Sequence, residues 1–430
     1  MTTVRTAELP RLLPRDGRRP EDYRAHTARH GPIPYRGAAG RLIGDIQEAG
    51  LRGRGGAAFP TDRKLAAVLA AATKRRVRPV VIANGAESEP ASDKDATLLW
   101  LAPHLVLDGL QLAAEAVGAD RAILYTHADR ARDVGKRLHA ALGERRADRV
   151  EVRLAAAPPR FLSGQETALA NHLGGGPAIP TFTPTRITER GLGSAPTLVQ
   201  NVETLAHLAL IARYGPRWFR QVGTRDEPGS LLVTIRRGDG RPRIVEVPFG
   251  VPLASLLGEL AHGGAVLVGG YHGTWLPASQ AATLRLDNES LGGAGASVGA
   301  GILAALPGDR CGLVETARAV RYLALESAGQ CGPCLNGLPR MSAALTALAT
   351  GTAAGAATAR TLADLERWAG LVTGRGACHH PDGTARFVRS ALRTFGDELA
   401  AHERGRCGAA NAAHYLPVPS AAARGEEDWL

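Results

Sequence analysis

Short apolar runs alternate with longer amphipathic segments over residues 41–228. The runs RPVVIANG, RAILYTH and VEVRLAA predict strands, because they are short and rich in branched apolar residues. Around them, apolar residues recur every three or four positions, which predicts helices in RLIGDIQEAG, TDRKLAAVLAAAT, LLWLAPHLVLDGLQLAAEAVG and ARDVGKRLHAAL. Strands that alternate with helices indicate a parallel sheet. We therefore expect an α/β fold whose Rossmann-like domain covers residues 41–228.

The pattern changes after residue 228. SLLVTIRR and RIVEVPFG predict a hairpin, VPLASLLGELA a helix and AVLVGG a strand, and these elements are too short for a second Rossmann-like unit. We expect a small β-grasp domain, ubiquitin-like and of the SLBB type, over residues 229–305. Helical patterns then dominate residues 306–405 and predict a bundle. Residues 1–40 are expected to form an irregular lead-in, and residues 406–430 a flexible tail.

Composition and charge argue against a nucleic-acid-binding protein and against a membrane-inserted one. The net charge is +11, but the arginines are scattered, and no basic stretch is interleaved with the aromatics that stack on bases. We therefore expect a basic solvated surface that could dock an acidic electron-transfer partner, and no nucleic acid. The first twenty residues contain no apolar signal segment, and no apolar run reaches the roughly 18 residues of a membrane helix. We expect a soluble, cytoplasmic chain without membrane insertion.

Five cysteines point to metal binding or free thiols. Their odd number in a large chain without a secretory signal argues against a disulfide framework. Cys331 and Cys334 form a C-x-x-C pair at the start of a predicted helix, and Cys378 follows in GRGACHHPDG. By itself this pattern fits a zinc site, a thioredoxin-like pair or an iron–sulfur cluster.

The loop in GLRGRGGAAFPTDRK places three glycines just before a helix. Gly53, Gly55 and Gly56 let backbone N–H groups approach an anion, and the helix N-terminus adds partial positive charge. Arg54 and Lys64 would bring cations to the same place. Taken alone, the segment is explained equally well by a tight turn.

Four segments together resemble one known family. GLRGRGGAAFPTDRK, VIANGAESEPASDKD, FLSGQETALANHLGG and PTLVQNVETLAHL are similar, in the same order, to segments of the NADH-binding FMN and iron–sulfur flavoprotein of respiratory complex I, its F subunit. The likeness covers most of residues 41–400 and suggests a divergent paralogue. It implies that the chain is an NAD(P)H dehydrogenase that uses FMN, NAD(P)H and an iron–sulfur cluster.

The resemblance also implies roles for individual residues. Gly53, Arg54, Gly55, Gly56 and Lys64 would lie against the phosphate and the flavin. Asn84 and Glu87, with Glu89 in the same segment, would contact the isoalloxazine ring, and Asn201 and Thr204 would lie near the ribityl phosphate. Gly164 and Glu166 would form the nicotinamide pocket, where Glu166 acts by positioning the ring rather than by transferring a proton.

Several positions depart from the family pattern. Ala86 replaces an aspartate that would contact the flavin. Phe59 matches one aromatic residue that packs around the dinucleotide, but Ala67 and Arg186 stand at the positions of two others. Since stacking on an aromatic ring contributes about 1–3 kcal/mol per base, we expect weaker binding of NADH or use of another donor.

The segment ESAGQCGPCLNG resembles the family's cluster motif, ESCGxCxPCRxG. Cys331, Cys334 and Cys378 match three of the four [4Fe–4S] ligands, whereas Ala328 replaces the first. A [3Fe–4S] centre, or a [4Fe–4S] centre with one iron ligated differently, would result. Substitute ligands nearby are His379 and His380, which we interpret as exposed loop residues, and the more remote Cys311. We expect Cys407 to be free.

The resemblance implies hydride transfer from NAD(P)H to FMN, followed by single-electron transfer through the cluster. The acceptor would be a small iron–sulfur protein, such as a thioredoxin-like [2Fe–2S] subunit or a ferredoxin. The alternative is a degenerate binding or scaffold protein that retains the fold but lacks the cluster.

Overall fold

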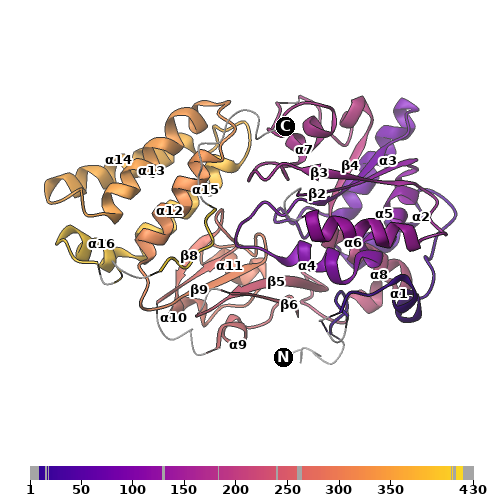
Figure 1. Cartoon of the computed structure of the whole chain (residues 1–430), viewed down its shortest axis with the longest axis horizontal. Helices are drawn as coiled ribbons and strands as arrows, with labels where there is room; N and C mark the ends of the chain where they lie inside the picture. The colour runs from indigo at the N-terminus through magenta and orange to yellow at the C-terminus, as the bar shows by residue number, and fades with distance from the viewer. Residues whose placement is uncertain are drawn as a thin grey trace.

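The computed structural model describes the chain except for residues 1–8, 15–16, 18, 128–130, 183, 239–240, 259–263, 408, 410–412 and 420–430, and except for the side chains of residues 131–133. An α/β part, a second sheet and a helical C-terminal region follow one another along the chain, and the second sheet lies between the other two (Figure 1). The α/β fold and the helical C-terminal region were both expected from the sequence.

The first sheet is entirely parallel, with strand order β3-β2-β1-β4. Its strands are β1 (Val80–Gly85), β2 (Arg121–His127), β3 (Val152–Ala157) and β4 (Thr197–Asn201). The three predicted strands are β1, β2 and β3. The fourth strand, β4, was not predicted, and it places Asn201 directly beside Asn84 of β1 in the register of the sheet.

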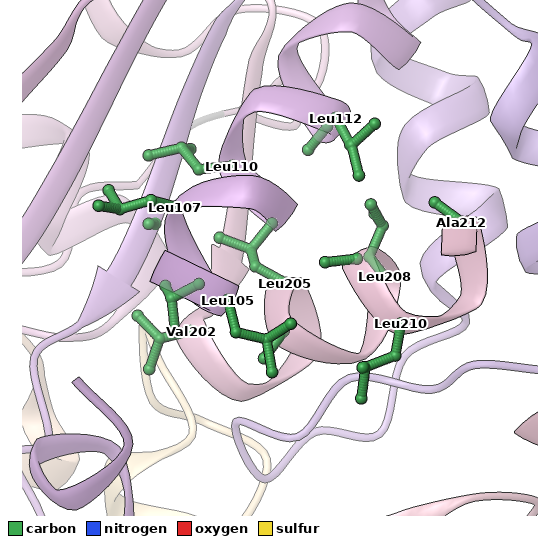
Figure 2. Packing of buried hydrophobic residues seen from close by; sticks show 14 of the residues in the cluster. Leu105, Leu107, Leu110, Leu112, Val202, Leu205, Leu208, Leu210 and Ala212 are labelled. Atoms are coloured by element: carbon green, nitrogen blue, oxygen red, sulfur yellow. The ribbon is translucent and has the colours of Figure 1, made fainter. Parts of the chain in front are cut away.

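Helices cover one face of this sheet. They are α2 (Arg41–Ala49), α3 (Thr61–Arg75), α4 (Lys94–Leu101), α5 (Pro103–Val117), α6 (Ala131–Glu144) and α8 (Val202–Phe219). The leucines of α5 interdigitate with those of α8 in the main core (Figure 2). The two helices approach closely at Gly109, where an added Cβ would lie 1.9 Å from the backbone oxygen of Leu205. The opposite face carries a smaller core under α7 (Glu166–Leu173) and the short 3-10 turn Leu192–Ser194.

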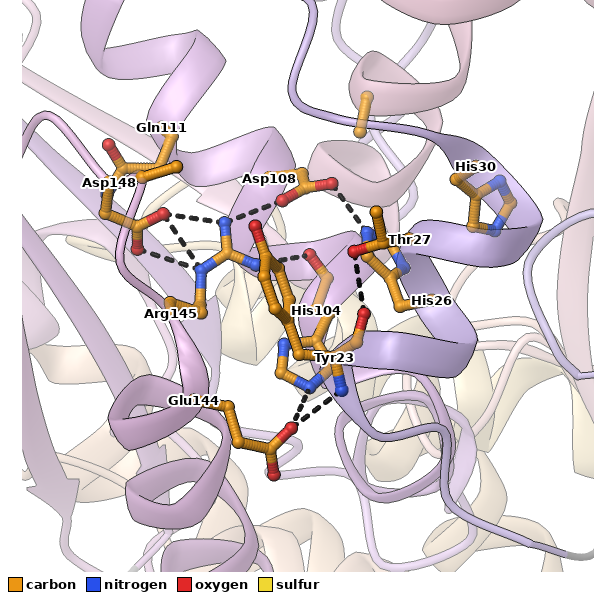
Figure 3. A network of polar contacts seen from close by, with 12 residues as sticks. Tyr23, His26, Thr27, His30, His104, Asp108, Gln111, Glu144, Arg145 and Asp148 are labelled. Carbon is orange, nitrogen blue, oxygen red and sulfur yellow. Dashed lines mark hydrogen bonds and ion pairs between the residues drawn. The ribbon is translucent and has the colours of Figure 1, made fainter.

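The N-terminal lead-in is more ordered than predicted. Residues Tyr23–His30 form helix α1, which is tied to α5 by the buried carboxylate of Asp108 (Figure 3). His26 Nε2 lies 2.7 Å and Arg145 2.6 Å from this carboxylate, and Arg213 also donates to it. Burial opposes the charge of Asp108, but these three partners hold its pKa well below the usual range. The expectation of an irregular segment was wrong because these contacts are made with distant residues.

The second sheet has the order β6-β5-β9-β7-β8. It comprises β5 (Ser230–Arg236), β6 (Pro242–Pro248), β7 (Ala265–Val268), β8 (Thr274–Pro277) and β9 (Ile302–Leu306). The predicted hairpin is the β5–β6 pair, and the central β5–β9 pair is parallel. Three short helices accompany the sheet: α9 (Leu253–Leu257), α10 (Ala278–Ala281) and α11 (Asn288–Gly293).

The C-terminal helices are α12 (Gly312–Leu325), α13 (Leu338–Ala349), α14 (Ala356–Val372), α15 (His380–Thr394) and α16 (Gly396–Glu403). A π-helical turn over Pro333–Gly337, labelled η4, leads into α13. The tail was expected to be flexible from residue 406, but its described part packs on the bundle. Tyr415 and Leu416 are buried, and their backbone N–H groups donate to Glu315 on α12 at 3.0 and 2.8 Å.

Within the described residues, no single helix has both the length and the apolar character needed to cross a membrane. Helices α4 and α5 would meet those criteria only as a pair, and they are bent by 96° relative to each other.

Candidate functional site

The predicted site residues gather at the carboxyl edge of the parallel sheet. Strand β1 lies between β2 and β4, so the chain leaves β1 toward one side of the sheet and returns on the other side as β4. Ligands in open α/β sheets bind at such a switch point, outside the carboxyl ends of the strands. Asn84 and Asn201 are paired there.

The glycine loop closes over this edge. Its base is held by two backbone hydrogen bonds, from Gly53 N to Phe59 O at 2.9 Å and from Thr61 N to Leu51 O at 3.0 Å. An added Cβ on Gly55 would lie 3.2 Å from Cβ of Asn201, so the loop backbone passes close to the end of β4. Gly56 has a φ of +103°, which side chains rarely tolerate. The loop therefore depends on glycine both for space and for conformation.

Arg54 has two separate roles in this loop. Its backbone N–H donates to Thr204 Oγ1 at 2.8 Å, which joins the loop to α8. Its buried guanidinium donates to the carbonyl oxygens of Pro228 and Ser230 and lies 4.6 Å from the ring centroid of Phe249. Burial lowers the pKa of Arg54 to about 10. The guanidinium thus joins the loop to the second sheet, and the expected cation on a phosphate is not what these contacts provide.

The third segment, which carries Gly164, closes the site from the other side. Asn84 Nδ2 donates to the backbone oxygen of Gly164 at 2.8 Å, and Asn84 Oδ1 accepts from the N–H of Ala86. An added Cβ on Gly164 would lie 2.6 Å from the oxygen of Ala86, so glycine is required for this crossing. The segment before α7 is therefore fixed over the end of β1.

Lys64 and Glu166 form a partly exposed ion pair between the first and third segments. Lys64 Nζ lies 2.6 Å from Glu166 Oε2, and Glu166 is 40% exposed. Lys64 belongs to the first turn of α3, and Glu166 is the first residue of α7, whose N-cap Gln165 accepts from the N–H groups of Thr167 and Ala168. Anions are favoured at helix N-termini. The pair thus joins the N-terminal turns of α3 and α7.

The carboxylates of Glu87 and Glu89 accept hydrogen bonds from backbone N–H groups of the chain. Glu87 accepts from the backbone N–H groups of Asp95 and Ala96, both at 3.1 Å, and so caps helix α4. Glu89 accepts from the N–H of Tyr271 at 2.8 Å and thereby joins the α/β part to the second sheet. Burial raises the pKa of Glu89 to about 7. Their contacts with a flavin remain predictions.

Sequence reasoning missed a buried polar cluster behind the glycine loop. Lys94 Nζ contacts Asp95 at 2.7 Å and Glu203 at 2.8 Å, and Asn201 Nδ2 donates to Asp95 Oδ2 at 2.6 Å. Burial opposes the charge on Lys94, but the carboxylates around it raise its pKa above the usual value. One feature of the sequence could have indicated this cluster. Lys94 is one of only four lysines in the chain, and it lies near the end of the segment VIANGAESEPASDKD.

Three cysteines converge near the start of α13. Cys334 is buried in η4, while Cys331 and Cys378 are partly exposed. Burial, reinforced by the neighbouring thiols of Cys331 and Cys378, raises the pKa of Cys334 to about 12. Ala328 occupies the position of the remaining ligand, which is the first cysteine of the family's cluster motif. Three soft sulfur donors on converging loops fit an iron–sulfur cluster chemically.

The nearby histidines are not ready substitutes for the fourth ligand. The side chain of His379 is fully exposed, as expected. His380 was expected to be exposed but is buried, with one ring nitrogen 2.9 Å from Leu323 O and the other 3.0 Å from His272. Both ring nitrogens of His380 are therefore engaged by protein atoms.

Cys311 and Cys407 are both free, as was expected of Cys407. Together with His402 they form a separate group, whose ligand atoms all lie within 4.8 Å of one another.

Comparison with known sequences assigns the chain to a family. The sequence model of the Nuo51 FMN-binding domain matches residues 46–210, and that of the NADH-ubiquinone oxidoreductase-F iron-sulfur binding region matches residues 315–402. One of the NADH-quinone oxidoreductase F subunits of Rhizobium meliloti is 30% identical over 382 residues, which cover 84% of this chain and 89% of the relative. The corresponding F subunit of Mycobacterium bovis is 30% identical over 388 residues, 85% of each chain. The chain belongs to the family of NADH-quinone oxidoreductase F subunits.

A solved structure shows the same fold as this member of the F-subunit family. A chain of an NAD+-reducing [NiFe]-hydrogenase in the H2-reduced state superposes with a TM-score of 0.75 at 30% identity. The match covers 84% of this chain but only 62% of the hydrogenase chain. The FMN-binding match includes every predicted cofactor residue from Gly53 to Thr204, and the iron–sulfur match includes Cys331, Cys334 and Cys378 but neither Cys311 nor Cys407.

Proposed function

We propose that this chain is an NAD(P)H dehydrogenase subunit that binds FMN at the carboxyl edge of the parallel sheet and an iron–sulfur cluster at Cys331, Cys334 and Cys378. The observation that carries the proposal is the convergence of four separate segments on one switch point. Asn84 contacts Gly164, Gly55 packs on Asn201, and Lys64 pairs with Glu166.

FMN, when bound, would accept two electrons as a hydride and release them singly. The chain supplies binding and orientation. The backbone of the glycine loop would offer N–H groups to the phosphate, with the N-terminus of α3 behind it. Asn84 and Asn201 present amide side chains at the ends of paired strands. Their orientation is fixed because each amide already bonds to a second segment of the site.

Glu166 is proposed to position the nicotinamide. A carboxylate oxygen accepts hydrogen bonds, and Lys64 holds the Glu166 side chain in place from 2.6 Å. The carboxamide N–H of a nicotinamide would be a suitable donor. No proton needs to leave Glu166, so its role is to orient the donor ring rather than to act as an acid or base.

Two exposed aromatic rings, one in the glycine-loop segment and one in the loop after α7, would hold the rest of the dinucleotide. Phe59 is 46% exposed beside the glycine loop, and Phe182 is 85% exposed. The loop before Phe182 is tied to α7 by a hydrogen bond from Thr181 N to Thr167 Oγ1 at 3.0 Å. We propose that Phe182 compensates for the aromatic residues missing at Ala67 and Arg186.

The proposed cluster site is joined to the flavin site through a buried ion pair. Arg160, at the start of the FLSGQE segment, lies 3.1 Å from Glu326, two residues before Ala328. Glu326 also accepts from the backbone N–H of Phe161 at 2.9 Å. This pair fixes the loop that carries Gly164 relative to the loop that carries Cys331. A fixed separation between the two sites is what electron transfer between them requires.

Each domain is proposed to have its own role, and the chain to have one partner protein. We infer that residues 41–228 bind FMN and NAD(P)H, that residues 229–305 form a β-grasp module around the parallel β5–β9 pair, and that residues 306–405 hold the cluster. The electron acceptor would be a small acidic iron–sulfur protein, a thioredoxin-like [2Fe–2S] subunit or a ferredoxin. The chain's net charge of +11 favours such a partner.

The proposal is tested by an absorption spectrum of anaerobically purified protein, before and after addition of NADH or NADPH, with assays of iron and sulfide. Flavin bands that bleach with one nucleotide, together with a broad iron–sulfur absorption, are expected. Flavin without iron would contradict the cluster assignment and make the Ala328 change a loss of the site. No chromophore after reconstitution with FMN, iron and sulfide would overturn the proposal in favour of a scaffold protein.

A further inference from the structure

A second group of metal-binding side chains lies at the far end of the helical region. Cys311 Sγ, His402 Nε2 and Cys407 Sγ provide ligand atoms that all lie within 4.8 Å of one another. Glu398 joins them, with its Oε2 3.1 Å from Cys311 Sγ. Cys311 and His402 are buried, and Cys407 is partly buried.

The separations suit one ion. Zinc binds sulfur at about 2.3 Å and nitrogen or oxygen at about 2.0–2.2 Å, so neighbouring donors of a zinc tetrahedron lie roughly 3.3–3.8 Å apart. Cys311 Sγ lies 3.3 Å from His402 Nε2 and 3.1 Å from Glu398 Oε2. Glu398 is not among the ligand atoms that all lie within 4.8 Å of one another, so its carboxylate would have to move toward His402 and Cys407 to complete the coordination.

The fold delivers these donors from three directions. Cys311 is the N-cap of α12, while Glu398 and His402 stand four residues apart on α16 and therefore share a face. Gly405 then adopts a φ of +67°, and Gly405 N and Arg406 N donate to the carbonyls of His402 and Ala401. This turn ends α16 and returns the chain, so that Cys407 faces His402.

The surrounding structure also orients the donors. Glu398 Oε2 accepts from the N–H of Leu313 at 3.1 Å, which directs the carboxylate toward Cys311. The turn between α15 and α16 packs against the start of α12, where an added Cβ on Gly312 would lie 2.2 Å from the ring of Phe395. Outer contacts of this kind hold ligands in place in metal sites.

We propose that Cys311, Glu398, His402 and Cys407 form a structural zinc site that fastens the end of the helical region to the start of α12. Two thiolates, an imidazole and a carboxylate are a donor set that zinc accepts, and four protein donors make a closed, structural site. The site is separate from the three-thiol site, because two of its ligands lie outside the iron–sulfur binding region at residues 315–402. It does not depend on the proposed oxidoreductase function.

Burial separates the proposed site from solvent, because Cys311 and His402 are both buried and Cys407 is partly buried. Zinc binds cysteine as the thiolate, so its binding would release protons and add directly to the stability of this end of the molecule.

The test is the zinc content of the full chain, purified and dialysed against metal-free buffer, measured by plasma mass spectrometry. About one zinc per chain is expected, with X-ray absorption showing two sulfur ligands at about 2.3 Å and two lighter ligands at about 2.0–2.2 Å. His402→Ala and Cys407→Ser should each lower the zinc content at least tenfold. His414→Ala, which changes a histidine of the same tail, and Cys378→Ser, which removes a thiol from the other site, should leave it unchanged.

Three results would overturn the proposal. One is wild-type zinc content in both site variants, and another is zinc that disappears with Cys378→Ser instead. The third is a Cys311–Cys407 disulfide in the wild-type protein, detected by peptide mass spectrometry without reduction. Because X-ray absorption uses the unmodified chain, the proposal stays testable even if a variant fails to fold.

Discussion

Lys64 Nζ lies 2.6 Å from Glu166 Oε2, and this ion pair joins the first turns of two helices that begin about one hundred residues apart in sequence. The pair is partly exposed, and it lies where the glycine loop and the segment over β1 meet. A ligand that binds beside this pair therefore meets the carboxylate of Glu166 already paired with the ammonium group of Lys64. Its geometry leads to the first prediction.

Replacing Glu166 by glutamine should weaken use of the nicotinamide donor. The amide keeps the shape but removes the charge, and a hydrogen bond to a charged group contributes about 1.5–3 kcal/mol. We expect kcat/KM for NADH to fall on the order of 10- to 100-fold while FMN content stays normal. Steady-state kinetics with ferricyanide as acceptor provide the measurement. Glu189→Gln, at an exposed carboxylate, is the control, and equal losses in both variants would contradict the assignment.

The exposed ring of Phe182 offers a second test of the same site. Phe182→Ala should raise KM for NADH roughly 5- to 100-fold, because a lost stacking partner costs about 1–3 kcal/mol. Phe182→Tyr keeps the ring and should retain the wild-type KM. If the alanine variant binds NADH as tightly as the wild type in a titration of flavin absorbance, Phe182 does not replace the missing aromatic residues.

Glu89 should make stability depend on pH near neutrality. Burial raises its pKa from 4.5 to about 7 in the folded protein. A raised folded pKa means that its contribution to stability is fully present below about pH 4.5 and is lost as the pH rises through 7. Glu89→Gln, which stays neutral while still accepting from Tyr271 N, should be more stable than the wild type at pH 8.5. Thermal unfolding should show Tm higher by roughly 1–2 °C there.

The difference in Tm between Glu89→Gln and the wild type should disappear on acidification, since wild-type Glu89 then becomes protonated and is neutral as well. Equal Tm differences at pH 5 and pH 8.5 would show that the pKa of Glu89 is not raised. Glu48→Gln, at an exposed carboxylate on α2, controls for the general effect of removing a negative charge.

Gly109 tests the packing of α5 on α8. A Cβ at this position would lie 1.9 Å from the oxygen of Leu205, so Gly109→Ala should destabilise the chain by about 1–3 kcal/mol despite the better helix propensity of alanine. Gly143→Ala, in α6, meets no atom within 4 Å and should stabilise by up to about 1 kcal/mol. Urea unfolding followed by circular dichroism would compare them, and equal shifts would contradict the close helix contact.

Restoring the missing thiol should strengthen the proposed cluster. Ala328→Cys adds a fourth cysteine beside Cys331, Cys334 and Cys378, and soft thiolates are the preferred ligands of these clusters. We expect more iron and sulfide per chain and a slower loss of the iron–sulfur absorption in air. Ala328→Ser is the matched control. Unchanged iron content in the cysteine variant would show that position 328 does not face the cluster site.

The local pattern of apolar and polar residues was sufficient to predict much of the fold. The strands β1, β2 and β3 were predicted because each is a short apolar run between helical segments. Strand β4 was missed, since Thr197–Asn201 is brief and runs directly into α8. Helix α1 was missed for a different reason: its sequence is polar, and its position is stabilised by contacts with distant residues such as the buried Asp108 on α5 and Glu144.

The site was predicted in part for similar reasons. The four segments were found from the order of their residues, but the direction of each side chain was not. Arg54 and Glu87 were predicted to contact the ligand, and the structure adds that their charged groups bond to backbone atoms beside the second sheet and in α4. Their contacts with a ligand stay predictions. The proximity of Cys311 and Cys407 was not predicted, because 96 residues of sequence separate two side chains that meet at His402.

The sequence by itself indicated the α/β class and the helical C-terminal region, because periodicity is a local property of the chain. The segments of the proposed flavin site were identified by their resemblance to a known family. Only the tertiary structure decided which charges face a ligand and which are used to join domains. It also decided which cysteines lie together. These outcomes depend on contacts between distant residues, whose free energies come from burial and pairing that local sequence does not record.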